Sequence, residues 1–172
     1  QGYGADTLRT YELFIGPYDQ KANWNTSAIG GVYRFLNRCW SLAFETKLEK
    51  ADKNKVIRNR TIKKVTDDIY DNGFNTAVAC MMEFVNELYK NGANKADVDA
   101  LARLLKPFAP HLACEMLEKL GAKDDVWPNY DESLLEDEEF ELIVQVNGKL
   151  RARVMVPTAD AEDKDKLEAA AK

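Results

Sequence analysis

Apolar residues recur at steps of three and four along most of this chain, and glycine or proline stops interrupt them at intervals. The stops occur at Gly16-Pro17, Asn72-Gly73, Asn91-Gly92, Pro107, Pro110 and Gly121. Because residues three and four apart share one face of an α-helix, each stretch between stops predicts an amphipathic helix. Such helices bury their apolar faces against each other, so residues 1–121 predict an antiparallel helical bundle.

The expected helices have the approximate bounds 5–14, 28–50 with cap residues at 25–27, 55–71, 75–91, 95–106 and 112–120. In the second helix the expected inward stripe is Ile29, Val32, Tyr33, Leu36, Trp40 and Ala43, with Arg34 and Arg38 on the opposite face. In the fourth helix the expected inward residues are Val78, Met81, Met82, Val85, Leu88 and Tyr89.

The pattern changes after Gly121. An acidic stretch, 122–138, reads as a linker, and residues 140–156 alternate like two strands around Asn147-Gly148. We expect a β-hairpin with a three-residue loop, 146–148, and a bulge, because this register keeps the apolar residues on one face. It places Glu141 opposite Arg153.

A charged helix is expected from Thr158 onwards, so residues 139–172 form the start of a small α+β module. The fold class is therefore mainly α. A hairpin and one helix are marginal as a domain, which indicates that this module is truncated. We expect a monomer whose open strand edge can pair with a second copy.

Composition is that of a globular protein, with 45% hydrophobic and 31% charged residues. Neither a secretory signal nor an apolar run of the roughly 20 residues of a membrane helix is visible. The three cysteines form no CxxC pair, which favours free thiols in the reducing cytoplasm. The net charge of −5 does not favour nucleic acid, but an uneven charge distribution matters more than the sum.

The sequence offers no set of nucleophile and base, no phosphate-binding glycine loop and no metal-ligand spacing. The single histidine, His111, follows Pro110 and is expected to be buried or to cap a helix. We therefore expect no catalytic residue, no metal and no cofactor in this chain. Trp24 and Trp127 lie in loops, where packing over a bundle end is more common than stacking on a base.

Basic residues are the remaining candidates for function. Residues 53–64 contain six cations and no acid, and such charges repel one another unless they meet an anionic surface. The candidates for binding nucleic-acid phosphates are Arg34, Arg38, Lys53, Arg60, Lys63, Lys64, Lys149, Arg151 and Arg153. The alternative for each of them is an ordinary solvated face.

Several motifs resemble those of bacterial-type leucyl-tRNA synthetase, a class I aminoacyl-tRNA synthetase. They are Tyr3-Gly4-Ala5-Asp6-Thr7-Leu8-Arg9, Phe14-Ile15-Gly16-Pro17, the segment from Gly31 to Trp40, Lys64 to Ile69, Phe74 to Ala77, Lys106 to His111, Trp127-Pro128, and Val144 to Arg151. They occur in the same order and span nearly the whole chain.

The resemblance implies a parent enzyme that attaches leucine to tRNA(Leu) with ATP and Mg²⁺ in the cytoplasm. Its HIGH and KMSKS catalytic motifs do not occur in this sequence. The bundle would correspond to the anticodon-binding-type domain of class Ia synthetases and residues 139–172 to the start of the C-terminal domain. The implied partners are the tRNA backbone and the rest of the synthetase chain, and Arg34 and Arg38 match positions that face the tRNA.

Two alternatives stay open. The chain could be a helical module for protein contact or scaffolding that binds no RNA, which the net charge of −5 favours. It could also be the matching part of isoleucyl-, valyl- or methionyl-tRNA synthetase. The Val146-Asn147-Gly148-Lys149 hairpin argues against this second alternative.

Overall fold

The computed structural model describes residues 2–25, 27–122, 126–135, 139–146 and 149–157. They form two compact units, Gln1–Tyr130 and Asp131–Lys172. The first unit contains the helices α1 (Gly4–Phe14), α2 (Ile29–Phe44), α3 (Lys55–Tyr70), α4 (Phe74–Asn91), α5 (Lys95–Leu105) and α6 (Pro110–Leu120). The predicted helical bundle is confirmed for this unit.

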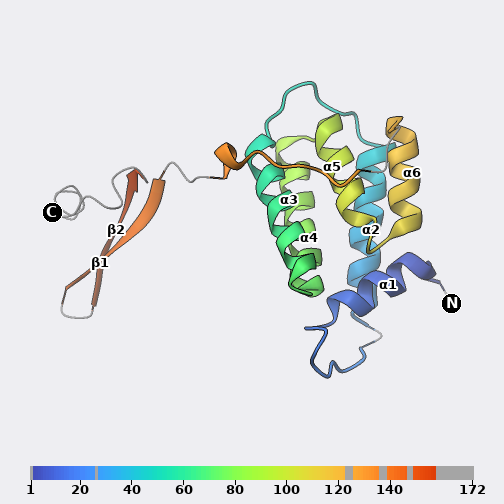
Figure 1. The fold of residues 1–172 in the computed structure, drawn as a ribbon, viewed down its shortest axis with the longest axis horizontal. Coiled ribbons are helices and arrows are strands. Elements are labelled where there is room, and N and C mark those ends of the chain that lie inside the picture. Colours follow the sequence, from blue (N-terminus) through green and yellow to red (C-terminus); the bar gives the residue numbers. More distant parts are fainter. Residues whose placement is uncertain (1, 26, 123–125, 136–138, 147–148, 158–172) are drawn as a thin grey trace. The chain divides into compact units, whose positions relative to one another are not determined.

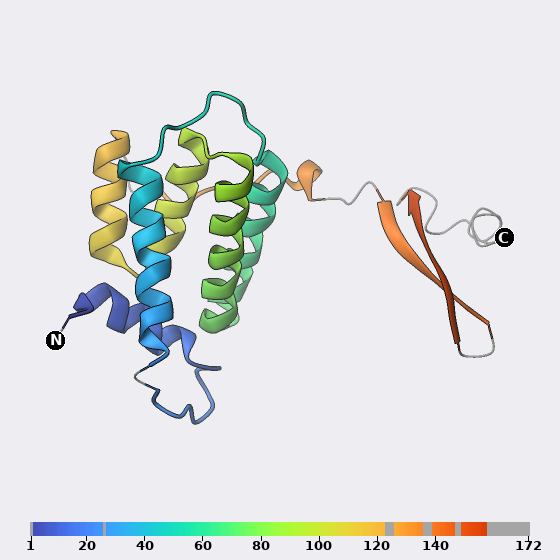
Figure 2. The ribbon, with the colours of Figure 1, turned by 180° about the vertical axis from the view of Figure 1, so that it is seen from behind.

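Helices α2 to α6 run side by side and alternate in direction, and α1 lies across the end of the bundle where α2 begins (Figure 1). The main packing pairs are α3 with α4 and α5 with α6, while α2 contacts α6, α1 and α4. Seen from behind, α2 and α4 form the near side of the bundle (Figure 2). Short connections join the antiparallel pairs α3–α4, α4–α5 and α5–α6, whereas residues 45–54 form a longer connection between α2 and α3.

The core lies between the helices, and its largest fully buried side chains include Tyr11, Leu42, Met81, Phe84, Leu88, Leu101, Phe108 and Met116. In α2 the expected stripe is partly wrong. Tyr33 and Trp40 are each 39% exposed, whereas Phe35, Cys39 and Leu42 are buried. The helix is turned so that these three side chains fill the space between its neighbours. Tyr89 of α4, also expected inside, is exposed as well.

Helix α2 ends at Phe44, several residues before the expected end near Lys50. The carbonyl of Ser41 accepts hydrogen bonds from the N–H groups of Glu45 (3.0 Å) and Thr46 (2.8 Å). It also accepts one from the Thr46 hydroxyl (2.9 Å). This bonding closes the last turn and directs the chain into the loop that leads to α3.

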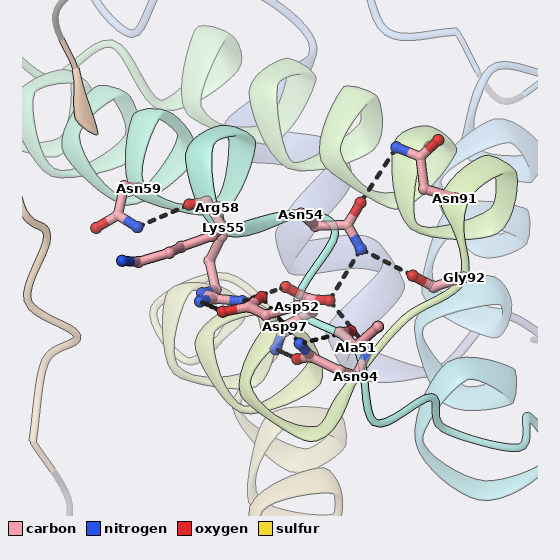
Figure 3. Close-up of polar contacts among 10 residues, drawn as sticks. All are labelled: Ala51, Asp52, Asn54, Lys55, Arg58, Asn59, Asn91, Gly92, Asn94 and Asp97. Atoms are coloured by element: carbon pink, nitrogen blue, oxygen red, sulfur yellow. Dashed lines mark hydrogen bonds and ion pairs between the residues drawn. The ribbon is translucent and has the colours of Figure 1, made fainter.

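A buried carboxylate joins α5 to the start of α3 (Figure 3). Asp97 is fully buried, and its Oδ1 accepts a hydrogen bond from Arg58 Nη1 at 2.6 Å. Its Oδ2 accepts from Asn54 Nδ2 and from the backbone N–H of Asn94, each at 3.0 Å. The Asn94 side chain in turn accepts from the Asp97 N–H at 2.9 Å, which completes a capping box at the start of α5.

The same cluster holds the turn between α4 and α5. Asn54 donates from its side chain to the carbonyl of Gly92 at 2.8 Å. Gly92 has a φ of +83°, and a Cβ there would lie 2.1 Å from Glu49 Oε1. Glycine is required at this position by both its backbone conformation and the available space.

Helix α1 is held against the corner between α5 and α6 by three polar side chains. Asp6 Oδ2 accepts from the Leu112 N–H at 2.7 Å and so caps α6 from 106 residues away. Arg9 donates to the Pro107 carbonyl (3.0 Å) and Thr10 to the Phe108 carbonyl (3.2 Å). The His111 side chain is 80% exposed, so its expected burial is wrong, and its Nδ1 lies 2.8 Å from Asp6 Oδ1.

Part of the acidic stretch after α6 packs on the first unit. Trp127 Nε1 donates to Thr66 Oγ1 at 2.9 Å, and Arg103 donates to the Val126 carbonyl at 2.7 Å. Tyr130 is partly buried against the core. Residues 123–125 and 136–138 of the expected linker lie outside the described residues.

The second unit contains a 3₁₀ turn (Glu132–Leu134) and the antiparallel strands β1 (Glu139–Val146) and β2 (Lys149–Pro157). The strands pair as a hairpin with a register shift between Val144 and Gln145, whereas the sequence predicts the bulge at the 146–148 loop. Val146 pairs with Lys149, so the expected three-residue loop is wrong.

The predicted pairing of Glu141 with Arg153 is also wrong, because Glu141 pairs with Met155 and Arg153 with Ile143. A loop that is one residue shorter moves each partner by one position, and the register shift between Val144 and Gln145 moves the partners beyond it by one more. The expected helix after Thr158 lies outside the described residues.

The buried cluster generates a stability prediction. Asp97→Ala should lower the free energy of unfolding by about 3 kcal/mol, because it leaves buried donors of Arg58 and Asn54 without their acceptor. The matched control is Asp99→Ala on the same helix, which removes an ion pair with Arg103 in which the Asp99 side chain is 33% exposed and should cost less than the loss of the fully buried Asp97, about 1 kcal/mol. Urea unfolding measures both, and equal losses would contradict the assignment.

Burial also predicts an order of thiol reactivity. Burial raises the pKa of the Cys39 thiol far above its usual range. Cys80 is only partly buried, and this burial also raises the pKa of its thiol, whereas Cys114 is exposed. A thiol reagent at pH 8 should therefore label Cys114 first, Cys80 more slowly and Cys39 only on unfolding. Peptide mass spectrometry after brief labelling checks the order. Labelling of Cys39 as fast as Cys114 in the folded protein would show that the core is not closed there.

Candidate nucleic-acid interface

Helix α2, with the candidates Arg34 and Arg38, lies within a long stretch of sequence that contains no acidic residue. No Asp or Glu occurs between Asp19 and Glu45, and the cations in this stretch are Lys21, Arg34 and Arg38. The chain as a whole has 29 acidic and 24 basic residues. The outer face of α2 is therefore locally positive although the net charge is negative.

Arg34 is exposed on this face. Its guanidinium folds back over the first turn of α2. Its terminal nitrogens lie 3.8 and 4.0 Å from the positions that a Cβ atom would take at Gly30 and Gly31. Within the described part of the chain, Arg34 has no hydrogen-bond or ion-pair partner. Its donors are available to an anion.

Arg38 lies one turn further along α2 and is held by α4. Its Nη1 donates to Asn86 Oδ1 at 2.7 Å, and its guanidinium carbon lies 4.6 Å from the centre of the Tyr89 ring. The Tyr89 hydroxyl donates to the Arg38 carbonyl at 3.0 Å. A guanidinium has five N–H donors, so Arg38 keeps most of them while its position is fixed.

The basic segment at the start of α3 is different. Acids from outside the 53–64 window compensate much of its charge: Glu49 pairs with Lys53, Asp67 with Lys63 and Asp68 with Lys64. The expectation that these cations repel one another unless they meet an anionic surface is wrong, because it counted charges within one window. Lys55 and Arg60 are exposed, and Arg60 also has an interaction partner.

Arg58 has a structural role in this segment. It forms two hydrogen bonds to Asp52, at 2.7 and 2.8 Å, besides its bond to the buried Asp97. The bonds from Arg58 lower the pKa of the Asp52 carboxyl, and Asp52 raises the pKa of the guanidinium against the opposing effect of burial. The Arg58 side chain is thus engaged in ion pairs within the fold.

The hairpin candidates lie on β2 of the second unit. Lys149 pairs with Val146 and Arg153 with Ile143, while Arg151 falls at the register shift. These residues belong to the second unit, whereas α2 and α3 belong to the first.

Neither loop tryptophan is a simple stacking platform. Trp24 packs edge-on against Tyr11 with ring centres 5.1 Å apart. Trp127 covers a shallow hollow of about 270 Å³ lined also by Thr66, Ile69, Tyr70 and Pro107. Both placements agree with packing over a bundle surface, as expected from the sequence.

Sequence reasoning missed the contacts that position Arg38. Asn86 and Tyr89 lie 48 and 51 residues away from it, and no local pattern links them. The absence of acids between residues 20 and 44 was a visible signal for the importance of α2. The described residues contain no cluster of three or more His, Cys, Asp or Glu suited to a metal ion. None of the described helices has both the length and the apolar character needed to cross a lipid bilayer.

These features are those of a helical domain with a positively charged outer helix, and comparison with known families identifies its class. The family of the anticodon-binding domain of tRNA ligase matches residues 57–166, which is more than half of the chain. The chain belongs to this family of anticodon-binding domains of class I tRNA ligases. Arg34, Arg38 and Lys53 precede the matched range, whereas the other candidates lie within it.

A solved structure gives a more particular likeness. The chain is similar to the agnB2 LeuRS of Agrobacterium radiobacter K84, in a ternary complex with tRNA and LeuAMS, with 31% sequence identity and a TM-score of 0.78. The match covers 98% of this chain and 25% of that chain. The chain thus spans about a quarter of the LeuRS chain it matches.

The different environments of the two arginines predict different costs on removal. Arg38→Ala should lower the free energy of unfolding by about 1 kcal/mol, because it loses a hydrogen bond and a cation–π contact. Arg34→Ala should change it by less than about 0.5 kcal/mol, because an exposed side chain without partners is lost. Urea unfolding followed by circular dichroism compares them. If both variants had the same free energy of unfolding as the parent protein, the contacts of Arg38 would contribute nothing measurable to stability.

Proposed function

We propose that this chain is the tRNA-binding, non-catalytic part of a leucine–tRNA ligase. In this proposal it grips the backbone of tRNA(Leu) rather than reading bases. The observation that carries the proposal is the acid-free outer face of α2, which presents the unpartnered Arg34 next to the pre-positioned Arg38. The family of the chain and its likeness to a LeuRS that was solved with tRNA support the proposal.

The chemistry of the two arginines suits phosphate. A planar guanidinium can donate two parallel hydrogen bonds to phosphate oxygens, and the charge assists both bonds. Arg38 loses little conformational freedom on binding because Asn86 and Tyr89 already hold it. Arg34 is exposed and has no partner among the described residues to give up. Two such residues one turn apart can contact neighbouring phosphates of one strand.

Other cations contribute less in this proposal. Lys53, Lys63 and Lys64 would exchange an existing ion pair for a phosphate, so the net gain is reduced. Arg60 on α3 and Lys149, Arg151 and Arg153 on the hairpin stay candidates for further backbone contacts.

The catalytic activity belongs, in this proposal, to a cytoplasmic parent enzyme that joins leucine to tRNA(Leu) with ATP and Mg²⁺. We assign no residue of this chain to ATP, to a metal or to the reaction. The rest of the synthetase chain is the second proposed partner, because the match covers only 25% of the LeuRS chain.

One observation favours a protein-contact function instead. The hollow beside Trp127 is lined mainly by apolar surface, including Ile69 and Pro107, and the neighbouring Tyr70 is highly exposed. Such a surface suits another protein segment better than a phosphate backbone. A chain that only scaffolds other domains would show no salt-dependent RNA binding. The corresponding part of another class Ia ligase would bind RNA without preferring tRNA(Leu).

The test is binding of tRNA(Leu) and of an unrelated tRNA across a salt series. The affinity should fall with salt because binding releases counterions, and Arg34→Ala/Arg38→Ala should weaken it and reduce the slope of log K against log salt by about 0.8 for each lost contact. The control Lys55→Ala/Lys95→Ala removes the same charge at two exposed positions on other helices, α3 and α5. It should leave the slope nearly unchanged.

The outcomes separate the candidates. No binding at low salt would overturn RNA binding by this chain and favour the protein-contact function. Equal effects of the two double variants would show that only total charge matters and that the α2 face is not the site.

A further inference from the structure

Tyr3 stands immediately before α1 and reaches the first turn of α2. Its ring packs edge-on against Tyr33, with ring centres 5.4 Å apart. Its hydroxyl lies 3.8 Å from the position that a Cβ atom would take at Gly30, and Arg34 Nη1 lies 3.8 Å from the same position. The hydroxyl of α1's leading residue and the guanidinium of α2 therefore border the same space above one glycine.

Few groups enclose that space. Gly30 and Gly31 have no side chains, so the Arg34 guanidinium can lie directly over the helix backbone. Apart from this backbone and the chain neighbours of Gly30, the described groups within 4 Å of its Cβ position are the guanidinium and the Tyr3 hydroxyl. Tyr3 is thus the side chain that limits the guanidinium on the side facing α1.

Helix α1 fixes the position from which Tyr3 acts. It lies across the end of the bundle where α2 begins (Figure 1). Three polar side chains fasten it to the corner between α5 and α6, namely Asp6, Arg9 and Thr10. Further along α1, the Tyr11 hydroxyl bonds to both the N–H and the carbonyl of Asn25. The residue that leads into so firmly anchored a helix is tied to the frame of the bundle.

The two candidate arginines are held in different ways. Arg38 is fixed from α4 by a hydrogen bond to Asn86 and by the Tyr89 ring, so it uses part of its donor set. Contact with Tyr3 confines Arg34 by van der Waals packing, and within the described part of the chain no hydrogen bond joins the two. A long side chain that is confined before binding loses less conformational freedom on binding. Arg34 can therefore be confined while its donors stay available.

We infer that Tyr3 is a positioning residue for the phosphate contact of Arg34. Its ring, set against Tyr33, keeps the guanidinium over the first turn of α2 and leaves the N–H donors to the phosphate. Helix α1 thereby does for Arg34 what α4 does for Arg38. This role rests on the proposed RNA binding and deepens it, because it assigns a residue outside α2 to a contact that α2 makes.

The test is a double-mutant cycle on binding of tRNA(Leu) by the whole 172-residue chain. Tyr3→Leu should weaken binding about three-fold, as expected when one long side chain must be ordered on binding. The slope of log K against log salt should stay unchanged, because no charge is removed. In the Arg34→Ala background Tyr3→Leu should have no effect, whereas in the Arg38→Ala background it should still weaken binding about three-fold.

The control is Tyr70→Leu, which changes a more exposed tyrosine on α3 and should leave binding unchanged. Tyr33→Leu removes the ring against which Tyr3 packs, so it should reproduce the loss and the same dependence on Arg34. It supplies the cycle if Tyr3→Leu does not fold by circular dichroism. A general defect in folding would weaken binding equally in every background, which separates such a defect from positioning.

The outcomes distinguish this role from the proposed function. Binding by the parent chain with no loss in Tyr3→Leu, or with an equal loss whether or not Arg34 is present, would overturn the positioning role and leave backbone binding intact. Failure of the parent chain to bind tRNA at low salt would overturn the proposed function and the positioning role with it.

Discussion

The carboxylate of Asp97 is the constraint on which the arrangement of α3, α4 and α5 depends. A fully buried charge is tolerated only when hydrogen bonds and an opposite charge surround it. Here the partners come from α3, from the residue before α3 and from the start of α5 itself (Figure 3). The relative position of these segments is therefore fixed by the geometry of one side chain. Arg58 becomes part of the framework as a result, and it is withdrawn from any role at the surface.

This constraint shapes the distribution of available charge. Ion pairs engage Lys53, Lys63 and Lys64 around α3, whereas α2 contains no acid and leaves Arg34 without an internal partner. The more basic segment by sequence is thus the less available one in the fold. Charge counting in a window fails here because acids at a distance of four residues in a helix, or across the bundle, lie as close as direct neighbours.

The order and approximate bounds of the helices could be predicted because glycine and proline stops act locally. The orientation of α2 could not, because the stripe through Tyr33 and Trp40 and the stripe through Phe35 and Cys39 both recur at helical spacing. Only the neighbouring helices decide which stripe faces inwards. The site was predictable to the same degree: the sequence indicated Arg34 and Arg38, but not the α4 residues that hold Arg38.

Helix α1 connects the packing of the bundle to the position of the outer face of α2. Its Asp6 caps α6, and the Tyr11 hydroxyl donates to the carbonyl of Asn25 (2.8 Å) and accepts from the N–H of the same residue (3.0 Å), just before α2. Tyr3 at its start packs edge-on against Tyr33, with ring centres 5.4 Å apart. The first turn of α2, over which Arg34 folds, is therefore held by contacts from α1. Positioning of the outer face of α2 is a property of the whole bundle rather than of that helix alone.

The net charge of −5 is compatible with a phosphate-binding face for a reason of length scale. At physiological salt the Debye length is about 8 Å, so acids elsewhere on a domain are largely screened from an RNA held at α2. Because α2 itself contains no acid, Arg34 and Arg38 have no acidic neighbour on their own helix. In the proposed function, the acidic residues elsewhere disfavour approach of RNA away from the basic residues, and this favours orientations that present α2. A domain that contacts a backbone without reading bases needs such an orienting field, since phosphates alone offer the same chemistry at every position along the strand.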